Sequence, residues 1–209
     1  MIHTVSVEAN QRNYGALWTS RELNQWQQHM SVFRVAVSDG NSTKPLCFRA
    51  FSGNMGGNSA VDPKSHQNAN WHQNIPCGYV PVTTVDAVLQ DAAQQQHKQG
   101  LMCPLAMKLD VEGFEHRALL GAKQLLQKYT PCLIAMEFHV PLLKAAGVAP
   151  PVETLQLLGD AGYEPKSHSL EKLRGVVTSN GITDTIWEHT TMNSGAQTGD
   201  TCWSRCLGP

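Results

Sequence analysis

The sequence predicts an α/β protein built on a mostly parallel sheet, and three central segments carry that prediction. Residues 105–109 form an apolar run typical of a buried strand, and the run ends on Asp110. The apolar side chains of residues 114–129 then recur at helical spacing, which predicts one amphipathic helix. A second apolar run, residues 132–136, ends on Glu137. Because ligands of open α/β sheets sit outside the carboxyl ends of the strands, we expect Asp110 and Glu137 to face one crevice.

Length and charge predict one domain and give no sign of a nucleic-acid or membrane partner. The 209 residues are enough to bury a substantial core, so we expect a single domain over residues 1–191. With 16 basic and 17 acidic residues the net charge is −1, which gives no electrostatic attraction to nucleic acid or to an anionic membrane. No apolar run approaches the roughly 20 residues that span a bilayer. The oligomeric state leaves no trace in the sequence.

Six cysteines bear on the compartment and on a metal site. Cys103 and Cys132 adjoin or lie in expected buried strands, where a reduced cysteine behaves as a small hydrophobic residue. Cys202 and Cys206 could form a disulfide or half of a metal site, but no second ligand pair has matching spacing. We therefore expect no metal and a reducing, cytoplasmic compartment.

Acidic residues also end two strands expected near the start of the chain. Residues 2–8 read as a strand that ends on Glu8, and Asn10 behind it is a good helix N-cap. Residues 32–39 read as a second strand that ends on Asp39. Four apolar runs thus end on an acid, which predicts a rim of carboxylates: Glu8, Asp39, Asp110 and Glu137.

The remaining segments are expected to surround this rim. Residues 40–79 are rich in Asn, Gln, His and Gly, and they form either a lid near the rim or a solvated insertion, with an extra strand at 46–51. We expect helices at residues 86–99, 139–146 and 152–161, the last followed by Gly162 as its C′ residue. Two weaker strands, 163–167 and 185–189, are joined by a turn-rich segment, and residues 192–209 form a disordered tail.

These motifs resemble the signature of FkbM-type S-adenosylmethionine-dependent methyltransferases. The resemblance rests first on the run Lys-Leu-Asp-Val-Glu-Gly-Phe-Glu at residues 108–115, followed by Leu-Gly-Ala at 120–122. It extends to Val-Glu-Ala-Asn at 7–10 with Asn13, Ala-Val-Ser-Asp at 36–39, Thr-Thr-Val-Asp at 83–86 and Ala-Met-Glu at 135–137. Order and spacing agree over roughly residues 3 to 165.

The resemblance implies a Rossmann-like class I methyltransferase fold, a doubly wound, mostly parallel sheet with an antiparallel seventh strand. It also implies methyl transfer from S-adenosylmethionine, usually to a hydroxyl of a sugar, lipid or other small molecule. Carried over by position, Glu8 would hold the two ribose hydroxyls, and Ser38 and Asp39 would lie beside the adenine. Asp110 would face the methionine end or the acceptor. Glu112 is expected in the first turn of the helix, where it would either bind cofactor or merely be stabilised by the helix dipole.

One departure from the family concerns its first strand. That strand and its glycine-rich loop should precede Ile2, and they normally lie mid-sheet between the strands that end at Glu8 and Asp110. We expect either a truncated gene product or a non-catalytic remnant that serves as a binding module. A strand ending in a glycine-rich turn, encoded upstream of Met1, would favour the enzyme.

Three residues are candidate bases for removing the acceptor's proton: Asp110, His139 and Glu137. A histidine has a pKa suited to this step, but His139 could equally be a structural residue that caps the next segment. Magnesium held by Asp110 and Glu137 is conceivable, yet two acids are a weak signal for it. A metal-dependent hydrolase that uses Asp110, Glu112 and Glu137 lacks a histidine pair at ligand spacing.

Overall fold

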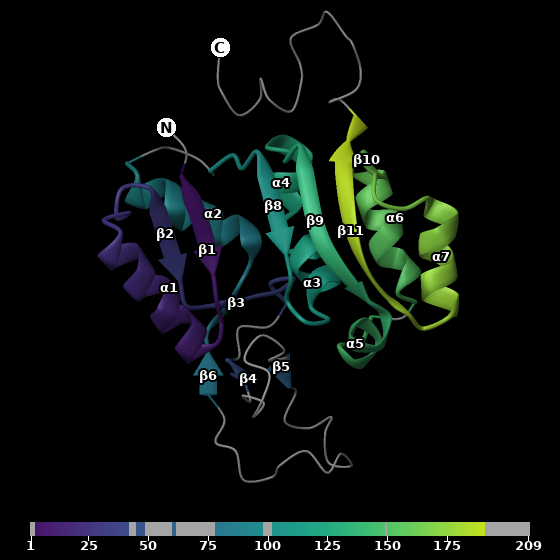
Figure 1. Cartoon of the computed structure of the whole chain (residues 1–209), viewed down its shortest axis with the longest axis horizontal. Coiled ribbons are helices and arrows are strands. Elements are labelled where there is room, and N and C mark those ends of the chain that lie inside the picture. The colour runs from purple at the N-terminus through teal and green to yellow at the C-terminus, as the bar shows by residue number, and fades with distance from the viewer. Residues whose placement is uncertain are drawn as a thin grey trace, which may run out of the picture.

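A computed structural model shows a mixed α/β protein with several small sheets (Figure 1). The structure describes residues 3–41, 45–48, 60–61, 78–97, 102–148 and 150–190. The expected tail and most of the polar insertion lie outside these residues. No helix in the described part of the chain has both the length and the apolar character needed to cross a bilayer.

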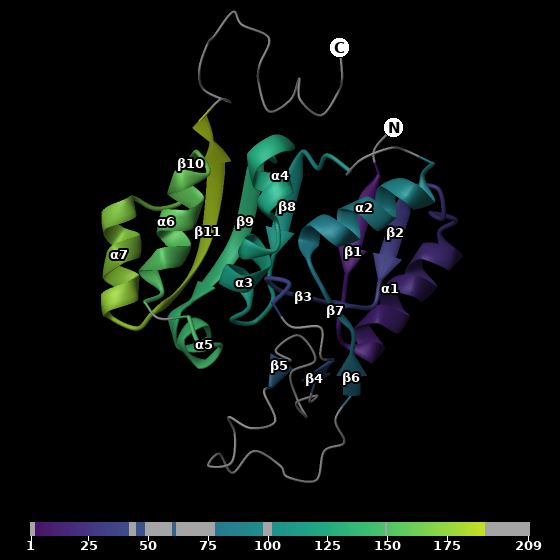
Figure 2. The same cartoon turned by 180° about the vertical axis from the view of Figure 1, so that it is seen from behind.

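The first sheet consists of two parallel strands, β1 (Thr4–Val7) and β2 (Met30–Phe33). Helix α1 (Gln11–Leu23) connects them and lies on one side of the pair, and α2 (Val85–Gln95) lies on the other (Figures 1 and 2). Asn10 caps α1, because its Oδ1 accepts hydrogen bonds from the amides of Arg12 and Asn13. The cap expected from the sequence is therefore confirmed.

The second sheet has four strands in the order β10, β11, β9, β8. Strands β8 (Ala106–Leu109) and β9 (Leu133–His139) are parallel, whereas β11 (Ile182–His189) runs antiparallel to β9 and to β10 (Tyr163–Pro165). An antiparallel strand near the end of the chain is what the resemblance implied.

Helices cover one face of this second sheet (Figure 2). They are α3 (Glu115–Leu120), α4 (Lys123–Lys128) and α6 (Val152–Asp160), with α7 (Leu170–Thr178) farther out. The short α5 (Val140–Ala145) follows β9 directly. Phe138 and Trp187 are fully buried against the helices, whereas Leu133 and Ile186 point to the opposite face and are exposed. Glu137 and Asp184, which are described below, lie on this less covered face.

The described residues form two further small sheets. Strand β3 (Ala36–Val37) pairs in parallel with β7 (Val82–Thr83). Strand β4 (Leu46–Phe48) pairs antiparallel with β5 (Ala60–Val61) and β6 (Gly78–Val80), so part of the extra strand expected at 46–51 is present.

The prediction of a single strand over residues 32–39 is wrong. β2 and β3 belong to different sheets, and Arg34 and Val35 separate them. Long-range bonds cause the break, since the amides of Ala36 and Ser38 donate to the carbonyls of Pro81 and Thr83. An unbroken apolar run does not reveal that its two halves pair with different partners.

The single helix expected over residues 114–129 is also two helices. It breaks between α3 and α4 at Gly121, where an added Cβ would overlap the carbonyl oxygen of Ser38. The carboxylate of Asp86 then caps the new helix, accepting from the amides of Gln124 at 2.8 Å and Leu125 at 3.0 Å. The break depends on Ser38 and Asp86, which lie far from it in the chain, so a local pattern does not contain it.

Two other expectations need correction. The segment expected to be turn-rich contains α7, which Ser169 caps by accepting from the amide of Lys172. Cys103 and Cys132 are disulfide-bonded rather than reduced. Disulfides persist mainly in oxidising compartments, so these two residues give no support to the expectation of a reducing one. The C′ position of Gly162, with φ +85°, is confirmed after α6.

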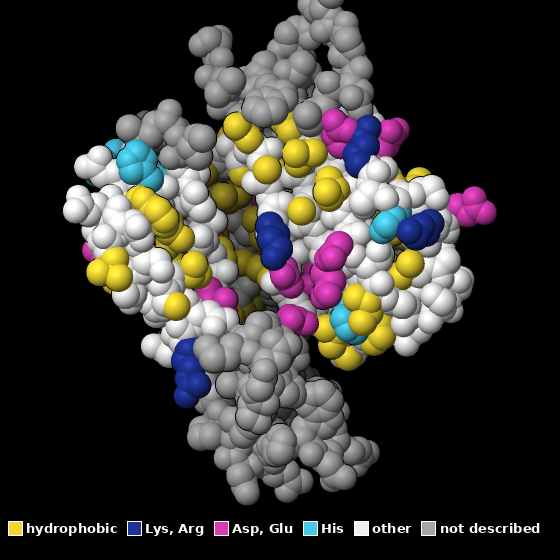
Figure 3. Space-filling model, in the orientation of Figure 1, with side chains coloured by type: hydrophobic (Ala, Val, Ile, Leu, Met, Phe, Trp, Pro, Cys, Tyr) yellow, Lys and Arg dark blue, Asp and Glu magenta, His cyan; other side chains and the backbone are white. Residues whose placement is uncertain are grey.

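Among the residues that the structure describes, no strand pairs with the second edge of β1 or of β8. Within the described residues, β1 pairs with β2 alone and β8 pairs with β9 alone. Figure 3 shows a cleft with hydrophobic side chains in its walls between the two parts of the molecule. The resemblance places the family's first strand between these two edges.

The tertiary cap on α4 gives a stability prediction. We expect Asp86→Ala to lower the free energy of unfolding by about 1 kcal/mol, the usual cost of losing an N-cap. Urea denaturation followed by circular dichroism measures the change. Asp91→Ala is the control, because Asp91 is exposed on the same helix. Equal effects of the two substitutions would contradict the capping role.

Candidate functional site

The carboxyl ends of β1, β2, β8 and β9 point to the same edge of the molecule (Figure 1). Glu8 follows β1, and Asp110 follows β8. Glu137 does not end its strand as expected, because β9 continues for two residues to His139. The acids expected at strand ends thus lie on both sides of the cleft, with Glu8 on one side and Asp110 and Glu137 on the other.

Three neighbouring strands place carboxylates at one level of the second sheet. Leu109 pairs with Met136, so Asp110 and Glu137 come next on adjacent strands, and Asp184 of β11 is the cross-strand partner of Glu137. Figure 3 shows acidic side chains gathered on this face beside the cleft. Lys108 partly balances the row, since its Nζ lies 3.0 Å from Oδ2 of Asp110. This pair is largely exposed and stabilises little by itself.

Sequence reasoning missed Asp184. The pattern predicts a strand that begins at Thr185, and the rule that ligands lie at the carboxyl ends of parallel strands does not include the start of an antiparallel one. Because β11 is antiparallel, its amino-terminal half lies at the level where β8 and β9 end. Asp184 could have been predicted as a site residue, because it is an acid that directly precedes the predicted antiparallel strand.

Glu112 lies in the turn between β8 and α3, not in the first turn of a helix as expected. Its φ is +52°, a left-handed conformation that is uncommon for a residue with a side chain. Burial raises the pKa of Glu112, and the charges of Glu137 and Asp110 raise it further, against an opposing effect of His139. Glu112 therefore lies in the electrostatic field of the acidic row and takes up a proton more readily than an ordinary glutamate.

His139 caps the helix that follows it. Its Nδ1 accepts a hydrogen bond of 3.3 Å from the amide of Leu142 at the start of α5. The neutral ring then carries its proton on Nε2, so the lone pair of this imidazole is already engaged. Only Phe138 separates His139 from Glu137, so both side chains lie on the same face of β9.

Glu8 lies on the other side of the cleft and is partly buried. Its Oε1 accepts a hydrogen bond of 2.7 Å from the amide of Asn10. No donor in the described part of the chain bonds to Oε2. One oxygen of this carboxylate is therefore fixed by the turn into α1, and the other can accept from a ligand.

Ser38 and Asp39 follow β3 and lie against the helices. Ser38 is buried, and its hydroxyl lies 3.4 Å from Oδ1 of Asp39. Burial raises the pKa of Asp39, but hydrogen bonds from Asn41 and the charge of Arg117 outweigh it and hold the pKa below its ordinary value. A cavity of about 240 Å³ opens beside Asp39, between the start of α2 and the α3–α4 junction.

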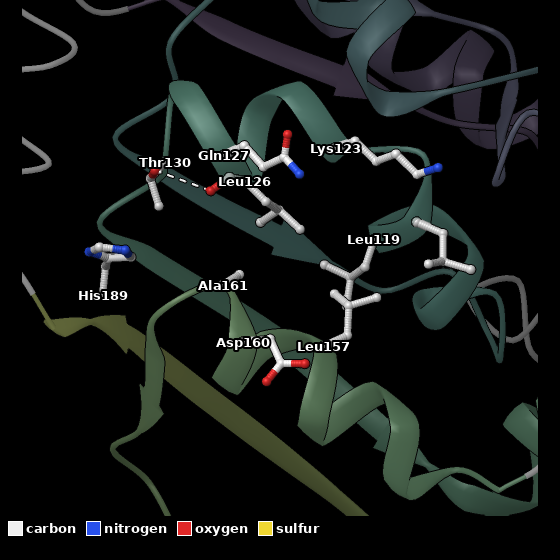
Figure 4. Close-up of a pocket in the computed structure, with 10 residues that line it drawn as sticks. Leu119, Lys123, Leu126, Gln127, Thr130, Leu157, Asp160, Ala161 and His189 are labelled. Carbon is white, nitrogen blue, oxygen red and sulfur yellow. Dashed lines mark hydrogen bonds between the residues drawn. The ribbon is translucent and has the colours of Figure 1, made fainter.

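A larger cavity of about 510 Å³ lies elsewhere, between α3–α4 and α6 on the helical face (Figure 4). Its walls are mainly apolar, with Leu119, Leu126 and Leu157, and Lys123 and Asp160 add charge at its sides. The sheet separates this cavity from the acidic row. It contains none of the residues expected at the site.

Glu115, the first residue of α3, is fully buried. Its Oε1 accepts hydrogen bonds from the amides of Val111 at 3.1 Å and Gly113 at 3.2 Å. Burial raises the pKa of Glu115, and Glu137 adds to the rise, although the backbone hydrogen bonds oppose it.

Within the described residues, no group of three or more His, Cys, Asp or Glu has the arrangement of a metal site.

The raised pKa of Glu115 makes stability depend on pH. A carboxyl group whose pKa is higher in the folded state favours folding below its unfolded value, here 4.5, and loses that contribution as pH rises through the folded value. Compared with Glu115→Gln, which cannot ionise, the wild-type protein should lose free energy of unfolding as pH rises above 4.5. Urea titrations at several pH values measure the difference. A constant difference would show that the folded state does not shift this pKa.

Comparison with known proteins finds one family for the chain. Residues 2–165 match the methyltransferase FkbM domain family, and the match includes all the strand-end acids named above. No curated protein and no solved structure matches the chain. Because the family match covers most of its length, the chain belongs to the FkbM methyltransferase domain family.

Proposed function

We propose that the protein transfers a methyl group from S-adenosylmethionine to a hydroxyl oxygen of a small molecule, a sugar or a lipid. The observation that carries this proposal is the placement of Glu8 at the end of β1, across the cleft from Asp110 and Glu137. The family supports methyl transfer, and the cofactor and the acceptor are inferences from the chemistry of the site.

The described donor set fits S-adenosylmethionine. The available oxygen of Glu8 suits the vicinal hydroxyls of a ribose, as acids do in dinucleotide sites. Ser38 and Asp39, beside the 240 Å³ cavity, would hold the adenine. Asp110 and Glu112 would attract the positively charged methionine end. When bound, the cofactor supplies an electrophilic methyl group on a sulfonium.

The acidic row supplies the acid–base chemistry for a hydroxyl acceptor. The protein must align the hydroxyl oxygen with the methyl group and remove the hydroxyl proton. Asp110 and Glu137 would orient the hydroxyl, and one of them would accept its proton. Glu112 lies beside them, and burial together with the charges of Glu137 and Asp110 raises its pKa. His139 is a weaker candidate, because its Nδ1 lone pair already caps α5.

The strand directions support a doubly wound sheet. Strands β1 and β2 are parallel, β8 and β9 are parallel, and all four point to one edge (Figure 1). We infer the order β2, β1, β8, β9, β11, β10, with one further strand position between β1 and β8.

A non-catalytic binding module is the second candidate. The specific observation in its favour is that β1 and β8 are each paired on one side only in the described residues. The binding of a cofactor that contacts both sides of this cleft would depend on how the edges of β1 and β8 are held relative to each other. Calorimetry with S-adenosylmethionine separates the candidates, since the module alone would not bind it.

Glu8 is the first residue to test. We expect Glu8→Ala to weaken the binding of S-adenosylmethionine by about 2 kcal/mol, as loss of a charged hydrogen-bond acceptor should. Titration calorimetry measures the affinity. Glu171→Ala, on the exposed side of α7, is the control and should bind as the wild type does. Unchanged affinity after Glu8→Ala would remove this residue from the site.

His139 can be tested for its two possible roles separately. Asparagine is a good N-cap but cannot accept a proton near neutrality, so His139→Asn should keep both stability and methyl transfer. His139→Ala should lose about 1 kcal/mol of stability through loss of the cap. Denaturation curves and methyl-transfer rates measure these effects. A stable His139→Asn variant that has lost activity would show that the histidine is the base.

A further inference from the structure

The carboxyl group of Glu115 folds back onto the turn that carries Asp110 and Glu112. Helix α3 begins at Glu115, and its N-cap residue Phe114 supplies no side-chain cap. Glu115 instead bonds through Oε1 to the amides of Val111 and Gly113. One oxygen atom therefore joins both ends of the segment 111–113 to the start of the helix.

This turn has a conformation that needs such a restraint. Glu112 and Gly113 have φ values of +52° and +95°, and a left-handed conformation costs a non-glycine residue roughly 1 kcal/mol or more. On its other side the turn packs tightly on α5, because a Cβ added to Gly113 would lie 2.7 Å from the carbonyl of Leu142. The turn is held between the carboxyl group of Glu115 and the backbone of α5.

Burial of Glu115 is not explained by local stability alone. Its Oε2 is buried and has no hydrogen-bond partner in the part of the chain that the structure describes. Burying a carboxyl group without satisfying both oxygens is unfavourable, so an apolar side chain would suit a purely structural position better. What the glutamate provides, and an apolar residue would not, is the acceptor for the two turn amides.

We propose that Glu115 is a positioning residue that fixes the 111–113 turn, so that Asp110 and Glu112 face the cleft in one arrangement. Glu115 itself touches neither substrate nor cofactor. Its effect on catalysis rests on the function proposed above, whereas its effect on the turn does not.

Two variants of similar size separate the acceptor from the bulk of the side chain. Glu115→Gln keeps an oxygen that accepts from both amides, and Glu115→Met fills the space without an acceptor. Glu153→Gln is the matched control, because Glu153 also lies in the first turn of a helix, α6, but is exposed. Amide hydrogen exchange at Val111 and Gly113 measures the turn directly, and calorimetry with S-adenosylmethionine measures its consequence.

We expect Glu115→Met to speed exchange of both amides by about tenfold or more and to weaken cofactor binding by a similar factor, since each lost hydrogen bond is worth about 1 kcal/mol. Glu115→Gln should restore both measurements to within about threefold of the wild type, and Glu153→Gln should change neither. Unchanged exchange in Glu115→Met, or exchange in Glu115→Gln as fast as in Glu115→Met, would overturn the proposal. The proposal would also be overturned if Glu115→Met bound S-adenosylmethionine as the wild type does while its turn amides exchanged faster. Should the wild type bind no S-adenosylmethionine, the proposed function fails, while the exchange rates still decide the role of Glu115.

Discussion

The parallel pairing of β8 with β9 is the interaction on which the rest of the site depends. On β9 the alternate residues Ile134, Met136 and Phe138 are buried under the helices, and this burial fixes which face each neighbouring residue occupies. Glu137 must then lie on the opposite face. A slip of one residue would bury its charge and expose the core, so the register is strongly specified. The position of the acidic row is therefore a consequence of the hydrophobic core.

The same register brings in the third strand. β11 contributes Thr185 and Trp187 to the buried side and Asp184 to the acidic row. Trp187 Nε1 donates to Oγ1 of Thr185, which in turn donates to the carbonyl of Met136. These buried bonds tie β11 to β9 beside Glu137. An acid from an antiparallel strand thus joins two acids from parallel strands. Burial raises the pKa of Glu112, and the charges of Glu137 and Asp110 add to that rise.

Much of this fold follows from local sequence, and the rest depends on long-range contacts. Apolar periodicity correctly predicted β8, β9, α5 and α6, because each is decided by its own pattern of buried side chains. It did not predict the break at Gly121, because that break is made by Ser38 and Asp86, which are distant in the chain. The parting of β2 and β3 has the same origin in bonds to the segment before α2.

The sequence predicted which residues belong to the site better than it predicted the hydrogen bonds that their side chains make. Asp110 and Glu137 were expected side by side, and the register of β8 and β9 brings them to one level. The engaged lone pair of His139 and the folded-back carboxyl group of Glu115 depend on backbone amides that become available only at helix starts and in a left-handed turn. No spacing of residue types encodes which amides those are.

Glu8 and the acidic row belong to different sheets, and this separation governs how a cofactor could be held. β1 is held by β2, which α1 contacts, whereas β8 is held by β9. The backbone groups along the two open edges require partners, since unpaired N–H and C=O groups are costly when water is excluded. Whatever satisfies those groups also sets the distance between Glu8 and Asp110. A ligand that touched both acids would therefore couple the two sheets, and its affinity would include the cost or gain of fixing them relative to each other.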